Sequence, residues 1–535
     1  MSGNERQLRT TFTTAAVQYA DHLRRNGQPD RAITVLAPVV KVAPDDGLGW
    51  LVLGLAFADR DDLDKAASAL RQAAQHAPGR AGTWVALGHV LALRGVRDEP
   101  VACFRRALAC DPNHLEGLVR LSTSLLLSGD RAEAVPFLDQ ALALAPEHPG
   151  ALAAWAQLKL QERKPDEVRT RLTWVFSTES ADARLIAMAA KAATLTGSPE
   201  IARPALDRAI AAHPPRPQLL VLLHARAELC DAMGDVDEAF QSWAQANETR
   251  GTTFDPTRHT QAIDHLIART KTFDFGALPK RFDERIVLVV GVPRSGSTLL
   301  EQALSRHPDI VACGELEALR DVALAIPCAD EQDWVDALPR LTGPIVRPLL
   351  QSYISSLLDA EQKAVRYVDK MPSNLLHLGL LARIAPGARV VVMQRDPMAT
   401  GFSCFRQPFG RGLGWATQLD HIGVWIREAN RLLEHWRATL PLRFHTVDYD
   451  ALVAEPEPTL RGVLNFLRVE FHADVLKPEA AARTAGTLSQ LEVLEPIHER
   501  SRGRWRPYGH HLGPLRAALG HIDQRHPDPD QLVAG

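Results

Sequence analysis

The sequence IVLVVGVPRSGST, residues 286–298, decides the fold of the second half of the chain. Residues 286–290 are five consecutive aliphatic residues, the pattern of a strand buried on both faces of a parallel sheet. Gly291 then permits a sharp turn, and residues 299–304 are predicted to be helical. A strand, a short loop and a helix in this order present backbone N–H groups at a helix N-terminus, where anions bind. The stretch therefore predicts a phosphate-binding loop in an α/β domain.

The spacing within this loop indicates which kind of phosphate it binds. From Gly291 the pattern is G-x-x-x-x-G-S-T, the nucleotide-binding pattern G-x-x-x-x-G-K-[ST] with Ser297 in place of the lysine. A nucleoside triphosphatase uses that lysine on the β- and γ-phosphates, beside a metal ion. Because Arg294 is the only cation in this loop, we expect a phosphate ligand without the ATP–magnesium apparatus. The alternative, a chance glycine–serine turn, is disfavoured by the strand–loop–helix context.

Composition excludes several classes of protein. The 535 residues accommodate two or more domains, and the formal net charge of −3 gives no general attraction to nucleic acid. The N-terminus has no apolar signal core, and no run of about 18 apolar residues predicts a membrane span. We expect a helix-rich cytoplasmic protein in a reducing compartment, since the cysteines lack paired spacing; they lie at 103, 110, 230, 313, 328 and 404.

The first half of the chain repeats itself every 34 residues, with prolines at positions 44, 78, 112 and 146. The recurring positions are small or apolar and in one unit are Trp50, Leu53, Gly54, Phe57, Ala66, Leu70, Ala73 and Pro78. They match the tetratricopeptide repeat, in which two helices cross closely at small residues and a proline follows the second. We expect about seven units over residues 1–250, and we assign Trp50 and Trp84 to packing.

The predicted fold is therefore a two-domain chain. An all-α tetratricopeptide-repeat solenoid precedes an α/β, P-loop-like domain with a parallel sheet over residues 283–520. Residues 251–282 are expected to form a linking helix (258–270) and a loop, and residues 521–535 a tail. Two roles for the repeats stay open, namely binding a peptide or protein on the concave face and bracing the second domain or a homodimer.

Polar residues follow the predicted strands, which we place at 286–290, 364–368, 389–394 and 444–447. Because ligands of open parallel sheets bind beyond the carboxyl ends of the strands, these residues are candidates for a site. Arg395 could contact a phosphate together with Ser403, eight residues on. Lys370 could meet a developing negative charge, and Tyr449 could stack on a base. Each also has a plain interpretation: a salt-bridged helix start, a solvated lysine and a packed tyrosine.

Together these segments resemble the sulfotransferases that use 3′-phosphoadenosine 5′-phosphosulfate (PAPS). Within that family they are most similar to tyrosylprotein sulfotransferases and to bacterial proteins that join tetratricopeptide repeats to such a domain. The resemblance spans about residues 280 to 510. It implies a 5′-phosphosulfate loop at Arg294, Ser295, Gly296, Ser297 and Thr298. It also implies a 3′-phosphate site at Arg395 and Ser403, and an adenine contact at Tyr449.

The same resemblance implies the catalytic residues. Glu315, after Cys313 and Gly314, corresponds to the general base of these enzymes, and Lys370 to their catalytic lysine. Ser489, fifteen residues before Arg504, corresponds to a catalytic serine. Arg294 and Lys370 would hold the sulfuryl oxygens, and Arg504 would add a contact to the donor.

The chain also departs from these relatives. The animal enzymes of the family tie the cysteine of Cys-Gly-Glu to a cysteine beside the catalytic lysine. Here that partner position is Asp369, so this disulfide cannot form. A further 3′-phosphate arginine of the family falls on Gln407, next to Arg406. His510 and His511 lack companion ligands at metal spacing and are assigned to the surface.

The predicted function is transfer of the sulfuryl group of PAPS to a hydroxyl, with PAP as product and no metal. The expected acceptor is a tyrosine of a peptide or protein, which the repeats could recruit. One alternative keeps the chemistry and takes a carbohydrate, lipid or small phenol as acceptor. Another class of function is a repeat adaptor whose second domain binds nucleotide without turnover.

Overall fold

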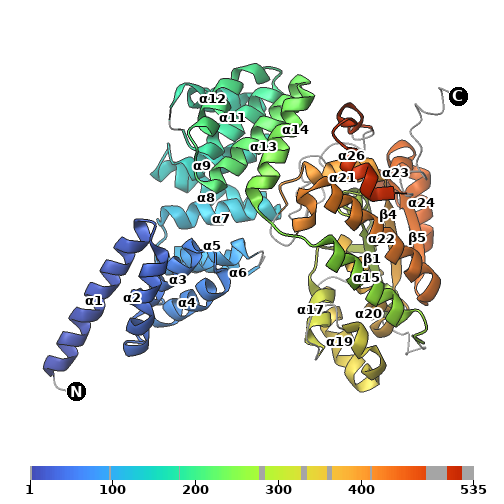
Figure 1. Cartoon of the computed structure of the whole chain (residues 1–535), viewed down its shortest axis with the longest axis horizontal. Coiled ribbons are helices and arrows are strands. Elements are labelled where there is room, and N and C mark those ends of the chain that lie inside the picture. Colours follow the sequence, from blue (N-terminus) through green and yellow to red (C-terminus); the bar gives the residue numbers. More distant parts are fainter. Residues whose placement is uncertain are drawn as a thin grey trace. The chain divides into compact units, whose positions relative to one another are not determined.

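The computed structural model describes residues 3–94, 98–179, 181–275, 283–326, 334–357, 364–409, 413–477 and 503–520. The chain forms two compact units, Met1–Ala205 and Leu206–Gly535. Figure 1 labels their elements along the chain, and each unit is described by itself.

The first unit is helical throughout its described residues. Consecutive helices pack as pairs, α1 with α2, α3 with α4, α5 with α6, α7 with α8 and α9 with α10. The last helix, α12, runs across the division between the units. The bounds are α1 Gly3–Arg25, α2 Pro29–Val42, α3 Gly47–Asp59, α4 Leu63–His76, α5 Ala81–Leu93, α6 Asp98–Cys110, α7 Leu115–Ser128, α8 Arg131–Leu144, α9 Pro149–Gln161, α10 Pro165–Leu172, η1 Thr173–Ser177, α11 Ala183–Leu195, η2 Pro199–Ile201 and α12 Arg203–Ala211.

The recurring residues of the repeat hold the helices of each pair together. A Cβ added at Gly54 would lie 2.6 Å from Leu70, and the glycine one repeat later is equally close to its partner, so larger residues would push the helices apart. Trp50 is half-buried, and its Nε1 donates to the Pro44 carbonyl at 2.9 Å; Trp84 makes the equivalent bond at 2.7 Å. The prediction of helical repeats, with tryptophans used for packing, is confirmed.

The second unit begins with helices and continues as an α/β domain. The predicted linking helix is α15 (Pro256–Thr270). The helices α13 (Arg216–Met233) and α14 (Val236–Arg250), expected as the last repeat, belong to this unit. The domain boundary near residue 250 follows the repeat pattern and stays a prediction.

Five parallel strands form one sheet in the order β2-β3-β1-β4-β5. They are β1 Ile286–Gly291, β2 Ile310–Gly314, β3 Arg366–Lys370, β4 Arg389–Gln394 and β5 Arg443–Asp448. The predicted fold class is confirmed. The sequence pattern missed β2 and placed β3 two residues too early, at 364–368. β1 is central, and the next strands of the chain lie on both of its sides, β3 on one side and β4 on the other. The strand order therefore reverses at β1, and open parallel sheets bind ligands at such a point.

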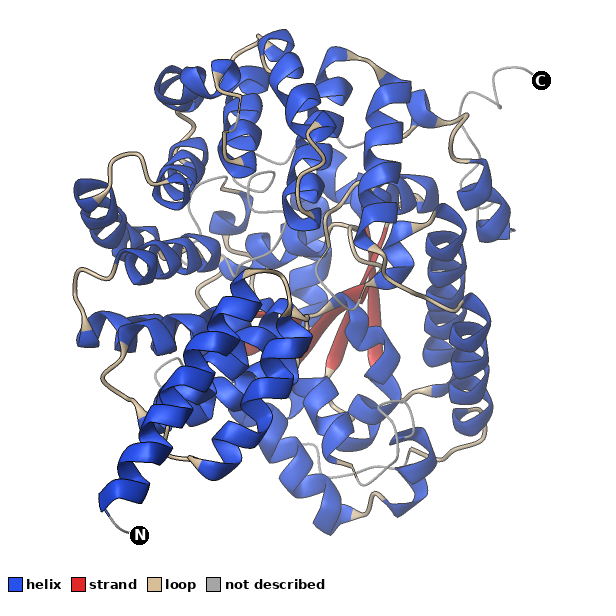
Figure 2. Cartoon of the chain, turned by 60° about the vertical axis from the view of Figure 1, so that its left-hand side comes forward, coloured by secondary structure: helices blue, strands red, loops and turns tan. Residues whose placement is uncertain are grey.

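Helices cover both faces of the sheet, as Figure 2 shows around the red strands. Val287 and Val289 of β1 join the core on the side of α16 (Ser297–Ser305), α23 (Tyr449–Ala454) and α24 (Pro456–Leu467). Leu288 and Val290 join the larger core on the side of α17 (Ala318–Ala325), α19 (Gly343–Leu357), α20 (Leu378–Ile384) and α22 (Leu419–Thr439). This alternation buries the strand on both faces, as the aliphatic run predicts.

The remaining elements of this unit connect and cover the strands. Their bounds are η3 Asp283–Arg285, α16 Ser297–Ser305, α17 Ala318–Ala325, α18 Trp334–Ala337, η4 Leu338–Arg340, α19 Gly343–Leu357, η5 Pro372–His377, α20 Leu378–Ile384, α21 Pro397–Phe405, η6 Gly414–Thr417, α22 Leu419–Thr439, α23 Tyr449–Ala454, α24 Pro456–Leu467, η7 Ala473–Leu476, η9 Arg506–Tyr508 and α26 Gly513–Leu519. No helix among the described residues combines the length and the apolar character needed to cross a membrane.

Candidate active site

The loop between β1 and α16 has the backbone of an anion cradle. Arg294 and Gly296 adopt positive φ values of 71° and 100°, and such alternation in a loop turns successive N–H groups to one side. Gly291 ends the strand so close to β4 that a Cβ there would lie 2.6 Å from the Met393 carbonyl oxygen. The Ser295 hydroxyl oxygen is buried and has no hydrogen-bond partner in the described structure. The loop thus holds one buried hydroxyl group, that of Ser295, that no described group of the protein engages.

The residues predicted for a second phosphate lie against this loop. Arg294 Nε donates to Ser403 Oγ at 3.1 Å, and Arg395 Nη1 donates to the Arg294 carbonyl at 3.1 Å. The Arg395 guanidinium stacks on the Tyr449 ring, 4.3 Å from its centroid. Burial lowers the pKa of Arg395, so an anionic ligand would stabilise its charge. The structure therefore brings together four predicted residues that follow three different strands, β1, β4 and β5.

Tyr449 also closes the loop from the other side. It begins α23, directly after β5, and Asp448 caps that helix by accepting from the Ala451 N–H at 2.9 Å. The Tyr449 ring is buried and touches the position that a Cβ on Gly296 would occupy. Only glycine fits at residue 296, because both its φ and this contact exclude a side chain.

A buried lysine stands between two carboxylates at the end of β3. Lys370 is fully buried, and its Nζ lies 2.6 Å from Glu315 Oε1 and 3.4 Å from Glu301 Oε2. Glu315 directly follows β2, and its side chain is 27% exposed, against 7% for Glu301. Burial raises the pKa of Glu301, although Lys370 opposes this. Glu315 is consequently the carboxylate of the pair that a second molecule can reach.

Glu301 is a site residue that the sequence reasoning missed. It lies on α16, one helical turn after Ser297, between the core residues Leu300 and Leu304. The available signal was its position among the core residues of the helix that follows the phosphate loop. A carboxylate on the buried side of a helix indicates a charged partner, because charged groups are rarely buried without one.

Asp369 forms a second buried polar group beside Lys370. Its Oδ2 accepts from the Tyr353 hydroxyl at 2.7 Å and from the Asn374 amide at 3.1 Å. Burial raises the pKa of Asp369 to about 7 and that of Cys313 to about 12. Cys313 is a free thiol, as expected from the aspartate at residue 369.

Of the two predicted residues near the C-terminus, the structure describes only Arg504. Ser489 lies outside the described residues. Arg504 forms an ion pair with Asp231 of α13, whose other oxygen accepts from the Tyr508 hydroxyl at 2.6 Å. Arg406 also pairs with this helix, through Glu228 at 3.1 Å. A role for Arg504 in donor binding stays a prediction.

Comparisons with known proteins find two families in the chain. Residues 287–473 match the model of the sulfotransferase family, and residues 19–81 match a tetratricopeptide repeat model. The chain joins tetratricopeptide repeats to a domain of the sulfotransferase family.

The relatives match only part of their own length. The chain is 28% identical over 309 residues to an uncharacterized protein of Aquifex aeolicus, covering 55% of this chain and 41% of that protein. It is 28% identical over 240 residues to protein-tyrosine sulfotransferase 1 of Danio rerio, covering 42% of this chain and 66% of that enzyme. The match thus spans less than two thirds of both relatives. A crystal structure of a tetratricopeptide repeat protein from Parabacteroides merdae matches 44% of this chain and 93% of its own, at 15% identity and a TM-score of 0.37.

Proposed function

We propose that this protein transfers the sulfuryl group of PAPS to a hydroxyl acceptor, with Glu315 as the general base. The observation that carries the proposal is the contact of a fully buried Lys370 with Glu315, at the sheet edge where the phosphate loop begins. The family of the domain supports the reaction type, and the relative named a protein-tyrosine sulfotransferase supports the acceptor class.

The residues present fit a donor with two separate phosphate groups. Ser295, Gly296, Ser297 and Thr298 would hold the 5′ end, where the buried Ser295 hydroxyl is left without a partner in the described structure. Arg395 and Ser403 would hold the 3′-phosphate, and Tyr449 would contact the adenine. Arg504 would add a contact only by exchanging its ion pair with Asp231. When bound, PAPS supplies the sulfuryl group and leaves as PAP.

The protein supplies the proton acceptor and the positive charge. A phenol has a pKa of about 10, so at neutral pH its oxygen needs a base within hydrogen-bond reach. Glu315 follows β2 at the carboxyl edge of the sheet and is partly exposed, so it can accept that proton. Lys370 and Arg294 would stabilise the charge that develops on the transferred group, and their fixed positions reduce the cost of reorganisation. Ser489 would donate a further hydrogen bond.

The proposed acceptor is a tyrosine of a peptide or protein, and the repeats would help to recruit it. Stacked tetratricopeptide repeats expose a continuous surface that suits extended peptides. A carbohydrate, lipid or small phenol is the alternative acceptor for the same site.

The test uses sulfur-labelled PAPS, a host-cell lysate and two matched variants. Glu315→Ala should abolish transfer while calorimetry still detects PAP, since the phosphate residues are intact. Glu317→Ala removes an exposed carboxylate two residues away and should retain wild-type transfer. Turnover of Glu315→Ala near the wild-type rate would show that another group is the base. Label found solely in glycans or metabolites would reject the protein acceptor, and binding of ATP with magnesium in preference to PAP would reject the donor.

A further inference from the structure

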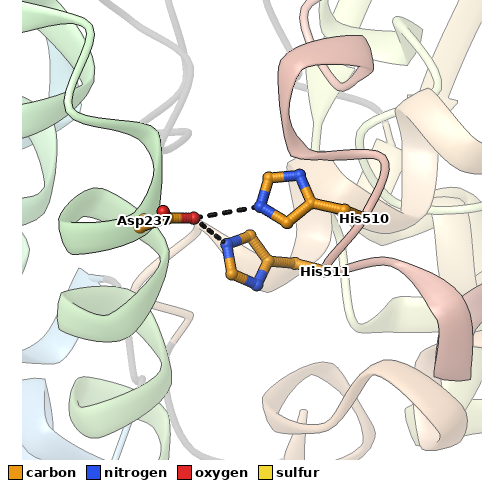
Figure 3. Close-up of side chains that lie close together, drawn as sticks. All are labelled: Asp237, His510 and His511. Carbon is orange, nitrogen blue, oxygen red and sulfur yellow. Dashed lines mark hydrogen bonds and ion pairs between the residues drawn. The ribbon is translucent and has the colours of Figure 1, made fainter.

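Three potential metal ligands from distant parts of the sequence meet on the second unit. Asp237 lies in the first turn of α14, and His510 and His511 lie between η9 and α26. The Nε2 atoms of His510 and His511 lie 2.9 and 2.8 Å from the same Asp237 oxygen, Oδ1, as Figure 3 shows. All three ligand atoms lie within 4.8 Å of one another. The sequence could not show this cluster, because the carboxylate is 273 residues from the nearer histidine.

Aromatic packing fixes the orientation of the two imidazoles. Phe240, one turn after Asp237 on α14, stacks on the His511 ring with centroids 4.2 Å apart, and the two histidine rings lie 4.0 Å apart. The backbone N–H of His511 donates to the backbone carbonyl of Tyr508 at 2.9 Å. This bond holds the turn that carries both histidine rings. The ligand atoms are therefore positioned by the fold before any ligand arrives, which lowers the entropic cost of binding.

The cluster is open to the solvent. The side chains of Asp237 and His510 are 70% and 60% exposed, and that of His511 is 22% exposed. An ion can enter from the solvent, and water can complete its coordination.

We propose that Asp237, His510 and His511 bind one divalent transition-metal ion of the zinc class. Two imidazole nitrogens and one carboxylate oxygen are a ligand set that such ions take with three protein ligands and an open position. With metal–ligand bonds of about 2.0–2.1 Å, tetrahedral ligands lie about 3.3 Å apart. The observed separations of 2.9 and 2.8 Å must widen by about 0.4–0.5 Å, which side-chain rotation at an exposed site can supply.

The bound ion would fasten the C-terminal segment 503–520 to α14. That segment already contacts the same helical pair through Tyr508 and Asp231. The metal would thus stabilise the docking of a segment that carries Arg504, independently of whether the proposed sulfuryl transfer takes place.

A second cluster of potential metal ligands on α13 and α14 must be distinguished from this one in the test. Cys230, Asp235 and Glu238, at the junction of α13 and α14, also bring their ligand atoms within 4.8 Å of one another. Variants of the aspartate–histidine cluster leave those three residues unchanged, so metal binding at the two places can be separated.

The experiment titrates the full chain, without a polyhistidine tag and after chelator treatment, with Zn²⁺ and with Mg²⁺. Calorimetry should find one Zn²⁺ per chain, no comparable Mg²⁺ binding, and a raised Tm with Zn²⁺. Asp237→Asn keeps a hydrogen-bond acceptor but loses the anionic ligand, and His511→Ala removes an imidazole. Both should weaken Zn²⁺ binding by about 100-fold or more, since even residues behind the ligands cost 10–100-fold.

The matched control is His265→Ala. It breaks another exposed histidine–aspartate pair, in which a single histidine contributes its Nε2 atom 3.0 Å from Asp336 Oδ2. It should bind Zn²⁺ like the wild type. Wild-type affinity retained in both Asp237→Asn and His511→Ala would overturn the proposal and leave the cluster as a surface ion pair. Equal binding of Mg²⁺ and Zn²⁺ would also overturn it.

Discussion

Replacing Asp369 by asparagine should remove a pH-dependent loss of stability from the sheet domain. Asp369 is completely buried in β3, and this burial raises its pKa from 3.8 to about 7. The Tyr353 hydroxyl and the Asn374 amide both donate to its Oδ2, and an amide oxygen at this position can accept the same two bonds. The substitution therefore removes a charge and keeps an acceptor for these two bonds, whereas the backbone N–H of Leu316, which also stabilises the ionised carboxyl, loses that charged partner.

The sign and size of the effect follow from the pKa. Because the pKa of Asp369 is higher in the folded state than in the unfolded state, its contribution to stability is fully present below about pH 4. It is lost as the pH rises through about 7. The rise from 3.8 to about 7 corresponds to about 4 kcal/mol, at about 1.4 kcal/mol for each tenfold change in proton affinity. As the pH rises from 5 to 8, we expect the free energy of unfolding of the wild type to fall by about 2–3 kcal/mol relative to that of Asp369→Asn.

The assay is urea unfolding of both proteins at several pH values between 5 and 8. Pulsed hydrogen exchange of peptides covering β1 and β3 restricts the readout to the sheet domain, since the repeats can unfold separately. Asp420→Asn, at an exposed residue of α22, is the control for a surface charge change in the same domain. A difference between wild type and Asp369→Asn that stays constant from pH 5 to 8 would refute the reasoning, because the buried carboxyl would then not take up a proton in this range.

Three further substitutions test other parts of the structure. Gly296→Ala should weaken PAP binding in calorimetry and lower stability by about 1–3 kcal/mol, because a side chain there meets Tyr449 and the positive φ disfavours it; unchanged binding would contradict the cradle. Lys370→Met should lower the free energy of unfolding of the sheet domain by about 3 kcal/mol in urea. This is at the low end for a broken buried ion pair, because Glu301 can take up a proton once the lysine is gone. Equal stability of the variant and the wild type would show that the ion pair makes no net contribution to stability. Leu36→Ala, at a fully buried repeat position, should cost about 2–5 kcal/mol and reduce hydrogen-exchange protection in the first unit alone; loss of protection in β1 would contradict independent units.

Strong local patterns made much of the fold predictable. The five aliphatic residues before Gly291 locate β1, and the bounds of β4 agree with the prediction at both ends. In contrast, β2 reads IVACG, too short and too mixed to stand out, and it became a strand only by pairing with β3 at the sheet edge.

Buried charge explains the remaining error in the strands. Asp369 and Lys370 look like the polar turn after a strand, so the sequence places the end of β3 at residue 368. In the structure both belong to the strand and are buried, because Tyr353 and Asn374 donate to the aspartate and two carboxylates contact the lysine. A single sequence does not reveal partners that come from other elements, and the carboxylate at residue 301 was missed for the same reason.

The hydrogen bonds of Arg294 connect the residues of the two proposed phosphate positions. Its side chain reaches Ser403, and its carbonyl receives Arg395, so a displacement of this residue disturbs both positions together. In the proposed donor site, the loop would therefore respond to the distance between the two phosphates of the donor. A nucleotide with a phosphate only at its 5′ end would contact the loop and would lose the contacts with Arg395 and Ser403. Discrimination among adenine nucleotides would accordingly arise from the number and spacing of their phosphates, and only secondarily from the base.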